Sequence, residues 1–279
     1  MKKRIAYLLG FGLACVVGTA EAEVRRVVSL NPCLDVILVN VADREQIAAL
    51  SHFSRDKDTS TIAELATTFP MSRESAEEVI SFTPDLVLTS RHSSSATRNA
   101  LRRVEIKTEL FSEPKSVTES IAQIRTISAL VNRVERGEEL IGRIEAALAA
   151  AAPAPDTLRL SALIFQSNGF STGGDTLVNE MLGRVGFINV ANRYGLTGWG
   201  TIPLERVIAD PPQVLLAGAL LADKPTWADR IVRHPALRDM QGRMKRATFP
   251  DRLLFCGGPV LIEAARALAA ARNSAAGMP

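Results

Sequence analysis

The stretch Ser75-Ala-Glu-Glu-Val-Ile-Ser-Phe-Thr-Pro-Asp-Leu-Val-Leu-Thr-Ser90 decides the fold, because a similar stretch returns at residues 203–218. The second copy is Pro-Leu-Glu-Arg-Val-Ile-Ala-Asp-Pro-Pro-Gln-Val-Leu-Leu-Ala-Gly. In each copy a glutamate, Glu77 or Glu205, precedes a Val-Ile pair, a proline and a short apolar run. This order predicts a helix, a stop and a strand. Two copies about half a chain apart predict two similar α/β lobes, each with an acidic residue at the same place.

The first 22 residues have the composition of a secretory signal peptide. Residues 2–4 are basic, residues 5–17 are largely apolar, and Ala20-Glu-Ala22 is a small-x-small cleavage site. We expect cleavage near Ala22 and export of the remaining chain. Lipidation at Cys15 is the alternative, although a large aliphatic residue is missing three positions before it.

Composition argues against highly charged partners. The whole chain has 33 Lys and Arg against 30 Asp and Glu, and removal of residues 1–22 brings the net charge closer to neutral. Nucleic acid and anionic membrane are therefore not predicted partners. The remaining chain is long enough for two lobes with separate cores. We place the lobes at residues 23–115 and 153–279.

Residues 116–152 are predicted to form one long helix that joins the lobes. Ser116-Val-Thr-Glu119 is a capping box, and apolar residues then recur at three- and four-residue steps. Gly137, which costs about 1 kcal/mol relative to alanine, is the one expected weak point. Such a helix would span roughly 50 Å, the scale of a whole molecule. A single stiff connection predicts lobes that move little when ligand binds.

Cys33 and Cys256 are the cysteines that follow the signal peptide. They lie near opposite ends of the chain, and two cysteines do not make a disulfide framework. We therefore expect two separate, partly buried thiols, with a disulfide as the alternative.

Enzyme motifs give little support for catalysis. The sequence lacks the nucleophile elbow, the phosphate loop, H-E-x-x-H and C-x-x-C. Of the histidines, only His52 and His92 lie in loops that can approach each other, so a direct metal site is not predicted. A secreted enzyme with Asp175 and His92 as acid and base is kept as one alternative. A ligand sensor that signals to a membrane receptor is another.

Loops that follow strands gather at the carboxyl edge of an open α/β lobe, where ligands bind. Here they supply aromatic, basic and amide groups, which suit a bulky, partly apolar ligand with polar groups at its periphery. The candidate ligand-binding residues are Trp199, Tyr194, Asn31, Cys33, Arg55, Arg91, His92, Asn168 and Phe170. The glycines on both sides of Trp199 favour an exposed ring, and packing within its lobe is the alternative.

The sequence resembles the helical-backbone periplasmic binding proteins of cobalamin and ferric-siderophore ABC transporters. The matching segments are residues 26–30, 77–88, 174–177, 186–189, 203–216 and 234–237. The paired E-x-[IV]-[IV]-x-x-x-P units are the most specific of these, and the resemblance covers residues 24–270. It implies two Rossmann-like lobes joined by a single long helix, a class III periplasmic binding protein. It further implies a monomer without enzymatic activity in the periplasm.

The resemblance also implies roles for individual residues. In that family one glutamate on each lobe docks the loaded protein onto arginines of an inner-membrane permease dimer with its ATPase subunits, and the matching residues are Glu77 and Glu205. The B12-binding members place a tryptophan six residues before the second glutamate, stacked on the corrin, and Trp199 has that spacing.

The implied ligand is a transported metal chelate, with no resident cofactor. Cobalamin or another corrinoid comes first, and a ferric siderophore or haem is the alternative. Siderophore binders use arginines against anionic oxygens. The arginines at hand are Arg55, Arg91 and Arg193. The further aromatic residues of B12 binders are not matched, since the chain has only 2 tyrosines.

Overall fold

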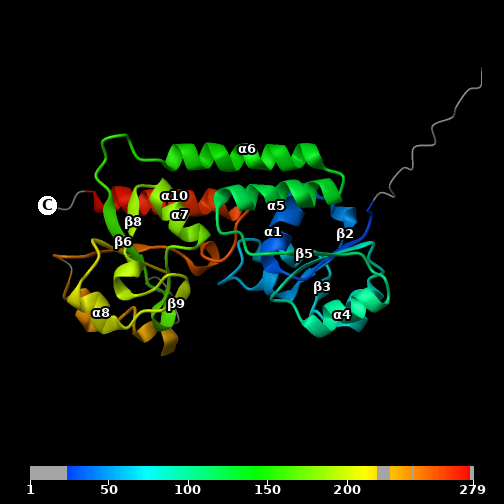
Figure 1. The fold of residues 1–279 in the computed structure, drawn as a ribbon, viewed down its shortest axis with the longest axis horizontal. Coiled ribbons are helices and arrows are strands. Elements are labelled where there is room, and N and C mark those ends of the chain that lie inside the picture. Colours follow the sequence, from blue (N-terminus) through cyan, green and yellow to red (C-terminus); the bar gives the residue numbers. More distant parts are fainter. Residues whose placement is uncertain (1–23, 219–226, 241, 277–279) are drawn as a thin grey trace, which may run out of the picture.

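The fold consists of two α/β lobes side by side, with helices running along one side of both (Figure 1). The computed structural model describes residues 24–218, 227–240 and 242–276. The signal-peptide segment 1–22, including Cys15, lies outside the described residues. Within the described ranges no helix has the length and apolar character needed to cross a membrane.

The N-terminal lobe contains a five-stranded parallel sheet in the order β3-β2-β1-β4-β5. Its central strands are buried on both faces, as parallel strands between helices usually are. The strands are β1 (Val27–Ser29), β2 (Ile47–Ser51), β3 (Met71–Ser72), β4 (Leu86–Ser90) and β5 (Thr108–Phe111). The helices are α1 (Pro32–Val41), α2 (Ala63–Ala66), α3 (Ala76–Ser81) and α4 (Ser95–Arg103), with 3-10 turns η1 (Arg44–Gln46) and η2 (His52–Arg55).

The C-terminal lobe contains a four-stranded parallel sheet in the order β11-β10-β6-β8 and an antiparallel pair, β7 with β9. The strands are β6 (Leu160–Ile164), β7 (Phe170–Thr172), β8 (Phe187–Asn189), β9 (Trp199–Thr201), β10 (Val214–Ala217) and β11 (Lys245–Thr248). The helices are α7 (Leu177–Arg184), α8 (Leu204–Ala209), α9 (Pro235–Arg238) and α10 (Val260–Ala275). The 3-10 turns are η3 (Ser167–Gly169), η4 (Ala191–Tyr194), η6 (Trp227–Arg230) and η7 (Asp251–Leu253).

The repeated sequence occupies equivalent places in the two lobes. The first copy forms α3 and β4, and the second forms α8 and β10. β4 pairs in parallel with β1, the first strand of its lobe, and β10 pairs in the same way with β6. The predicted order of helix, stop and strand is therefore confirmed in both copies.

The prediction of one continuous helix over residues 116–152 is wrong. The segment forms two helices, α5 (Val117–Leu130) and α6 (Val134–Ala151), which pack against each other. The chain reverses between them at Asn132, whose φ of 56° is left-handed. Gly137 is buried at this contact, where a Cβ would lie 2.6 Å from Cβ of Ser128. The glycine therefore permits a close approach of the two helices rather than bending one helix.

α6, the longer of the two helices, extends along both lobes. It packs against α1 of the N-terminal lobe and against α10 of the C-terminal lobe, and Figure 1 shows it extending over both. Its 18 residues correspond to about 27 Å. Asp43 pairs with Arg133 and Arg136 at one end of α6, and Arg272 of α10 donates to the carbonyl of Ala151 at the other. The fold class is confirmed, with α6 as the helical backbone.

The two cysteines form a disulfide, so the expectation of separate thiols is also wrong. Cys33 in α1 and Cys256 before α10 are bonded, with Cα atoms 5.0 Å apart. The loop around Cys256 is pressed onto α1, since Gly258 has a left-handed φ of 62° and no room for a Cβ beside Ile37. Cysteines that are 223 positions apart in sequence are neighbours because α10 returns to the junction of the lobes.

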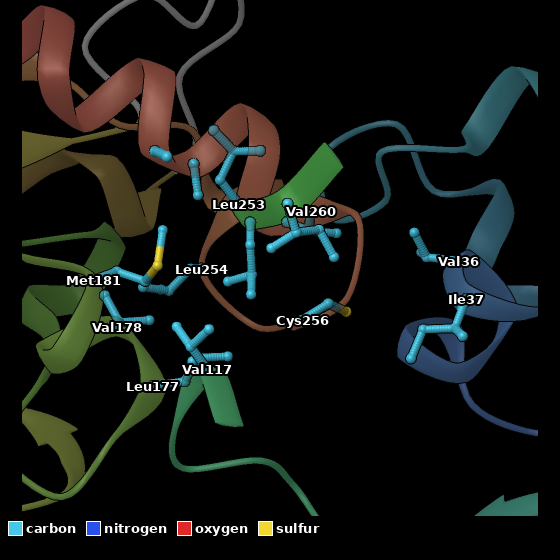
Figure 2. Close-up of a cluster of buried hydrophobic side chains, with 14 of the residues drawn as sticks. Val36, Ile37, Val117, Leu177, Val178, Met181, Leu253, Leu254, Cys256 and Val260 are labelled. Atoms are coloured by element: carbon cyan, nitrogen blue, oxygen red, sulfur yellow. The ribbon is translucent and has the colours of Figure 1, made fainter. Parts of the chain in front are cut away.

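One hydrophobic core crosses this junction. Figure 2 shows Ile37 of α1, Val117 of α5 and Leu177 of α7 around the loop that carries Cys256. Hydrogen bonds add to it, because the Ser120 hydroxyl accepts from the amide of Gly258 at 2.7 Å and Glu180 accepts from the amide of Val117 at 2.8 Å. The lobes are therefore joined by packing, by hydrogen bonds and by a covalent bond.

Candidate functional site

Side chains from the two lobes meet across the junction. Burial raises the pKa of Asp251 in the C-terminal lobe, and the nearby charges of Asp229 and Asp58 raise it further. Asp58 belongs to the N-terminal lobe, in the loop that follows η2. Lys115, which precedes α5, forms an ion pair with Asp175 of the C-terminal lobe, Nζ to Oδ2 2.6 Å. Side chains of both lobes therefore contribute to one region, as a cleft between two α/β lobes requires.

An aromatic cluster stands at this region, formed by Phe170, Trp199 and Phe255. The ring centroids of Phe170 and Trp199 are 5.6 Å apart with an interplanar angle of 11°. Phe255 lies 5.9 Å from Trp199 and 6.2 Å from Phe170. Trp199 is 37% exposed and Phe255 40% exposed. Such a cluster offers an apolar, polarisable face on which a flat ligand can stack.

The β7 and β9 pairing builds the first half of this cluster. Phe170 is in register with Thr201, and Thr172 with Trp199, so both rings are held by the backbone of the same antiparallel strand pair. Gly173 is tightly packed there, because a Cβ would lie 2.5 Å from the backbone of Thr197. The amide of Gly173 also donates to the carbonyl of Gly198 at 2.8 Å, which fixes the backbone next to Trp199.

Phe255 is the member of the cluster that sequence reasoning missed. It comes directly before Cys256, so the disulfide to Cys33 fixes the backbone next to the ring. The only sequence signal was a phenylalanine beside a cysteine ahead of a terminal helix, which is not specific. Its place beside Trp199 depends on the return of the chain to the lobe junction.

Beneath the aromatic cluster lies a pocket of ≈ 230 Å³. Trp199 and Phe255 line it, together with Lys115 and Asp175. The ion pair with Asp175 raises the pKa of Lys115, so this amine stays protonated at neutral pH.

Three predicted ligand-binding residues serve the fold instead. The side chain of Asn31 caps α1, where its Oδ1 accepts from the amides of Cys33 and Leu34 at 2.9 and 3.3 Å. Cys33 is consumed by the disulfide. Arg55 donates to the carbonyls of Ala66 and Phe69, which ties η2 to the end of α2.

Tyr194 is likewise a core residue rather than a residue of the cleft. Its side chain is buried, and its hydroxyl donates to the carbonyl of Asp210 at 2.6 Å. Burial and the nearby charge of Asp210 raise the pKa of Tyr194 to about 12. Tyr194 is the last residue of the 3-10 turn η4, and its ring packs into the C-terminal lobe.

The predicted residues Arg91, His92 and Asn168 are exposed. Arg91 donates to the hydroxyl of Ser112 at 3.2 Å, and Nε2 of His92 lies 3.9 Å from a carboxylate oxygen of Glu113. Asn168 has a left-handed φ of 56° in the turn between β6 and β7. These side chains stay candidates for contact with a ligand.

Glu77 and Glu205 are exposed in the first turns of α3 and α8. Both helices precede parallel strands, so both helix N-termini lie at the carboxyl edges of their sheets. The positive end of each helix dipole stabilises a carboxylate there. Within the part of the chain that the structure describes, no hydrogen bond or ion pair engages either side chain.

The enzyme and metal alternatives gain no geometric support. Asp175 is paired with Lys115, and His92 lies beside Glu113. No group of three or more His, Cys, Asp or Glu side chains within the described ranges is placed to hold a metal ion.

Comparison with known proteins agrees with the fold. A model of a periplasmic binding protein family matches residues 27–242. The cobalamin-binding protein of Halobacterium salinarum is 24% identical over 205 residues, a region that is 72% of this chain and 55% of that protein. The chain thus spans about half the length of this curated relative.

Solved structures extend the similarity over almost the whole chain. The apo form of the periplasmic heme-binding protein RhuT from Roseiflexus sp. RS-1 gives a TM-score of 0.72 at 25% identity, covering 91% of this chain and 99% of that one. The periplasmic vitamin B12-binding protein BtuF of Vibrio cholerae gives 0.67 at 14% identity, covering 90% and 98%. Because the family match covers most of the two-lobed architecture, the chain belongs to the periplasmic binding protein family, whose members are transport-related binding proteins.

Proposed function

We propose that this protein is the periplasmic solute-binding component of an ABC importer, which captures a corrinoid and delivers it to an inner-membrane permease. The observation that carries the proposal is the exposed face of Trp199, set at the lobe junction and followed six residues later by Glu205. The chain carries its cargo without transforming it.

Two features of the cleft support a corrinoid over an anionic iron chelate. The flat, partly exposed aromatic cluster suits a large macrocycle with apolar faces. All three arginines expected to meet anionic oxygens have partners within the protein. Arg55 donates to backbone carbonyls, and Arg91 donates to the hydroxyl of Ser112. Arg193 lies 3.6 Å from a carboxylate oxygen of Asp210. The curated relative from Halobacterium salinarum is named as a cobalamin-binding protein, which points the same way. The heme-binding name of RhuT makes haem the second cargo to test.

Glu77 and Glu205 are the proposed docking residues. They are exposed, occupy the same place in the repeated motif, and are presented by the two lobes at the carboxyl edges. One exposed ion pair is worth at most about 1 kcal/mol. Two carboxylates on one rigid body bind a twofold partner together, so the second contact forms at a high effective concentration. The covalent and hydrophobic junction described above supplies that rigidity.

The cargo is tested by titrating the purified protein with cyanocobalamin, a ferric hydroxamate and hemin, followed by absorbance and calorimetry. Cyanocobalamin is expected to bind most tightly, and Trp199→Ala to weaken it at least tenfold, which is about 1.4 kcal/mol. Trp227→Ala is the matched control, because Trp227 is 77% exposed and lies outside the aromatic cluster. Tighter binding of the hydroxamate or of hemin would replace the corrinoid, and binding of none would end the chelate proposal.

Docking is tested with the double variant Glu77→Gln, Glu205→Gln. Cargo affinity is expected to stay unchanged, while uptake in cells that depend on the limiting ligand falls at least tenfold. The matched control is Glu139→Gln, Glu145→Gln, which removes two exposed carboxylates from α6. Unimpaired uptake by the first variant would show that these glutamates do not dock the protein.

A further inference from the structure

We infer that the pocket beneath the aromatic cluster is a subsite for neutral carboxamide side arms of the cargo ring, and that it disfavours carboxylate arms. This inference rests on the proposed function and deepens it, because it states which chemistry at the edge of the macrocycle the protein selects.

The pocket is placed to receive such an arm. Trp199 and Phe255 form part of its lining, so a ring system that stacks on them lies next to the pocket. Its volume of ≈ 230 Å³ compares with about 30 Å³ for one water molecule in the liquid. A short acetamide or propionamide arm fits this space.

The apolar floor of the pocket suits the methylene part of the arm. Leu177 and Val178 from the start of α7 and Leu254 from the loop before Cys256 line it. These residues also belong to the core that crosses the lobe junction (Figure 2). The arm therefore inserts where the two lobes meet.

The polar end of the pocket offers one donor and one acceptor side by side. Nζ of Lys115 lies 2.6 Å from Oδ2 of Asp175, and the two side chains are 60% and 72% exposed. A primary amide has two N–H donors and a carbonyl acceptor. It can accept from Lys115 and donate to Asp175 at the same time, leaving the ion pair in place.

A carboxylate finds no such match, because it only accepts hydrogen bonds. It can meet Lys115, but it then faces the negative charge of Asp175. Glu113 also lines the pocket, and Glu119 accepts from the amide of Lys115 at 2.7 Å. The positive charges near this end are those of Lys115 and Arg91. The nearby charge of Arg91 acts to lower the pKa of Lys115, against the larger raising effect of Asp175. His92, 3.9 Å from Glu113, adds a charge only when protonated. At this end of the pocket the negative charge of the acidic side chains is therefore at least as large as the positive charge of the basic ones.

The test compares two macrocycles that differ in their arms. In dicyanocobinamide the arms are carboxamides, and in dicyanocobyrinic acid they are carboxylates. The unmodified protein is expected to prefer the amide form at least tenfold by absorbance titration at pH 7.5. Asp175→Asn is expected to narrow that preference at least fivefold, because an uncharged partner no longer repels a carboxylate. Asp156→Asn, an exposed acid in the loop before β6, is the matched control and is expected to leave the preference unchanged.

A second variant separates arm recognition from loss of an ion pair. Lys115→Asp with Asp175→Lys keeps one donor and one acceptor at the pocket and is expected to retain the affinity for dicyanocobinamide within about threefold. Lys115→Met alone is expected to weaken the binding of dicyanocobinamide by more than threefold. Thermal melting of each variant identifies any that fails to fold.

The outcomes separate this inference from the proposed function. If neither macrocycle nor cyanocobalamin binds, the corrinoid function is wrong. If both macrocycles bind and Asp175→Asn leaves their ratio unchanged, or the carboxylate form is preferred, the corrinoid function stands and the pocket does not select amide arms.

Discussion

Opening the disulfide between Cys33 and Cys256 is expected to lower the free energy of unfolding by several kcal/mol while both lobes stay folded. The bond joins positions separated by 223 residues. In the chain-entropy relation, a loop of this length corresponds to about 5 kcal/mol at 25 °C, at the upper end of measured values. The continuous core and the bond from the Gly258 amide to Ser120 remain when the disulfide is opened, so the folded state persists.

The assay is urea unfolding of the protein from residue 24 onward, followed by far-ultraviolet circular dichroism. Wild type is compared with Cys33→Ser, Cys256→Ser and with wild type in a phosphine reductant. Both changes are expected to lower the midpoint, and the slope is expected to rise because the unfolded chain without the cross-link exposes more surface. The serine variant with reductant is the control, and its midpoint should not move further.

A second readout concerns the site. Phe255 is one residue from Cys256, so the serine variant is expected to reduce the near-ultraviolet circular dichroism of the aromatic cluster and to weaken cyanocobalamin binding. The reasoning is refuted if two thiols of the native wild type react freely with Ellman's reagent, or if reduction leaves the midpoint where it was.

Three further predictions concern single residues. Burial raises the pKa of Asp35 to about 7, above the value of about 3.9 in an unfolded chain, so the folded state retains this proton longer. The stability linked to that proton is full in acid and is lost as pH rises from about 4 to about 7. Asp35→Asn should reduce the difference in the free energy of unfolding between pH 5 and pH 8, measured by denaturation curves. An equal difference in wild type and variant would contradict this prediction. Gly137→Ala should destabilise the protein by about 1–3 kcal/mol through overpacking. Gly142→Ala in the same helix has nothing within 4 Å of a new Cβ and should stabilise the protein by up to about 1 kcal/mol. Equal shifts of the melting temperature in the two variants would count against the close approach of α5 and α6 at Gly137. Tyr194→Phe should cost about 1 kcal/mol in urea unfolding by removing a buried hydrogen bond and leave cargo affinity unchanged, and a tenfold loss of affinity would return Tyr194 to the site.

Local signals in the sequence predicted much of the fold correctly. Asn31 and Pro32 begin α1, and the hydroxyl of Ser116 accepts from the amide of Glu119 at the start of α5. These signals act over three or four residues, so the chain carries them wherever the segment lies. The exposed first-turn positions of Glu77 and Glu205 follow from the same local rule, applied twice.

Backbone conformation and side-chain packing that no sequence signal predicted account for the errors. The break between α5 and α6 depends on a left-handed Asn132 and on Gly137 packing against Ser128, and neither a proline nor a turn cluster announces it. The outward face of Trp199 was predicted from its glycine neighbours, but the inward turn of Tyr194 was not. The orientations of both rings depend on the hydrogen bonds that hold residues 191–201 against β7.

The sequence by itself determined the two-lobed α/β architecture and the twin glutamates, because helix caps and apolar periodicity act over neighbouring residues and the internal repeat can be read from the sequence directly. Only the tertiary structure decided the disulfide, the place of Phe255 beside Trp199, and the Lys115–Asp175 pair above the pocket. Each of these joins residues that are far apart along the chain. The disulfide depends on the loop before α10 reaching α1, and the Lys115–Asp175 pair depends on α5 meeting α7. No local pattern specifies this long-range packing.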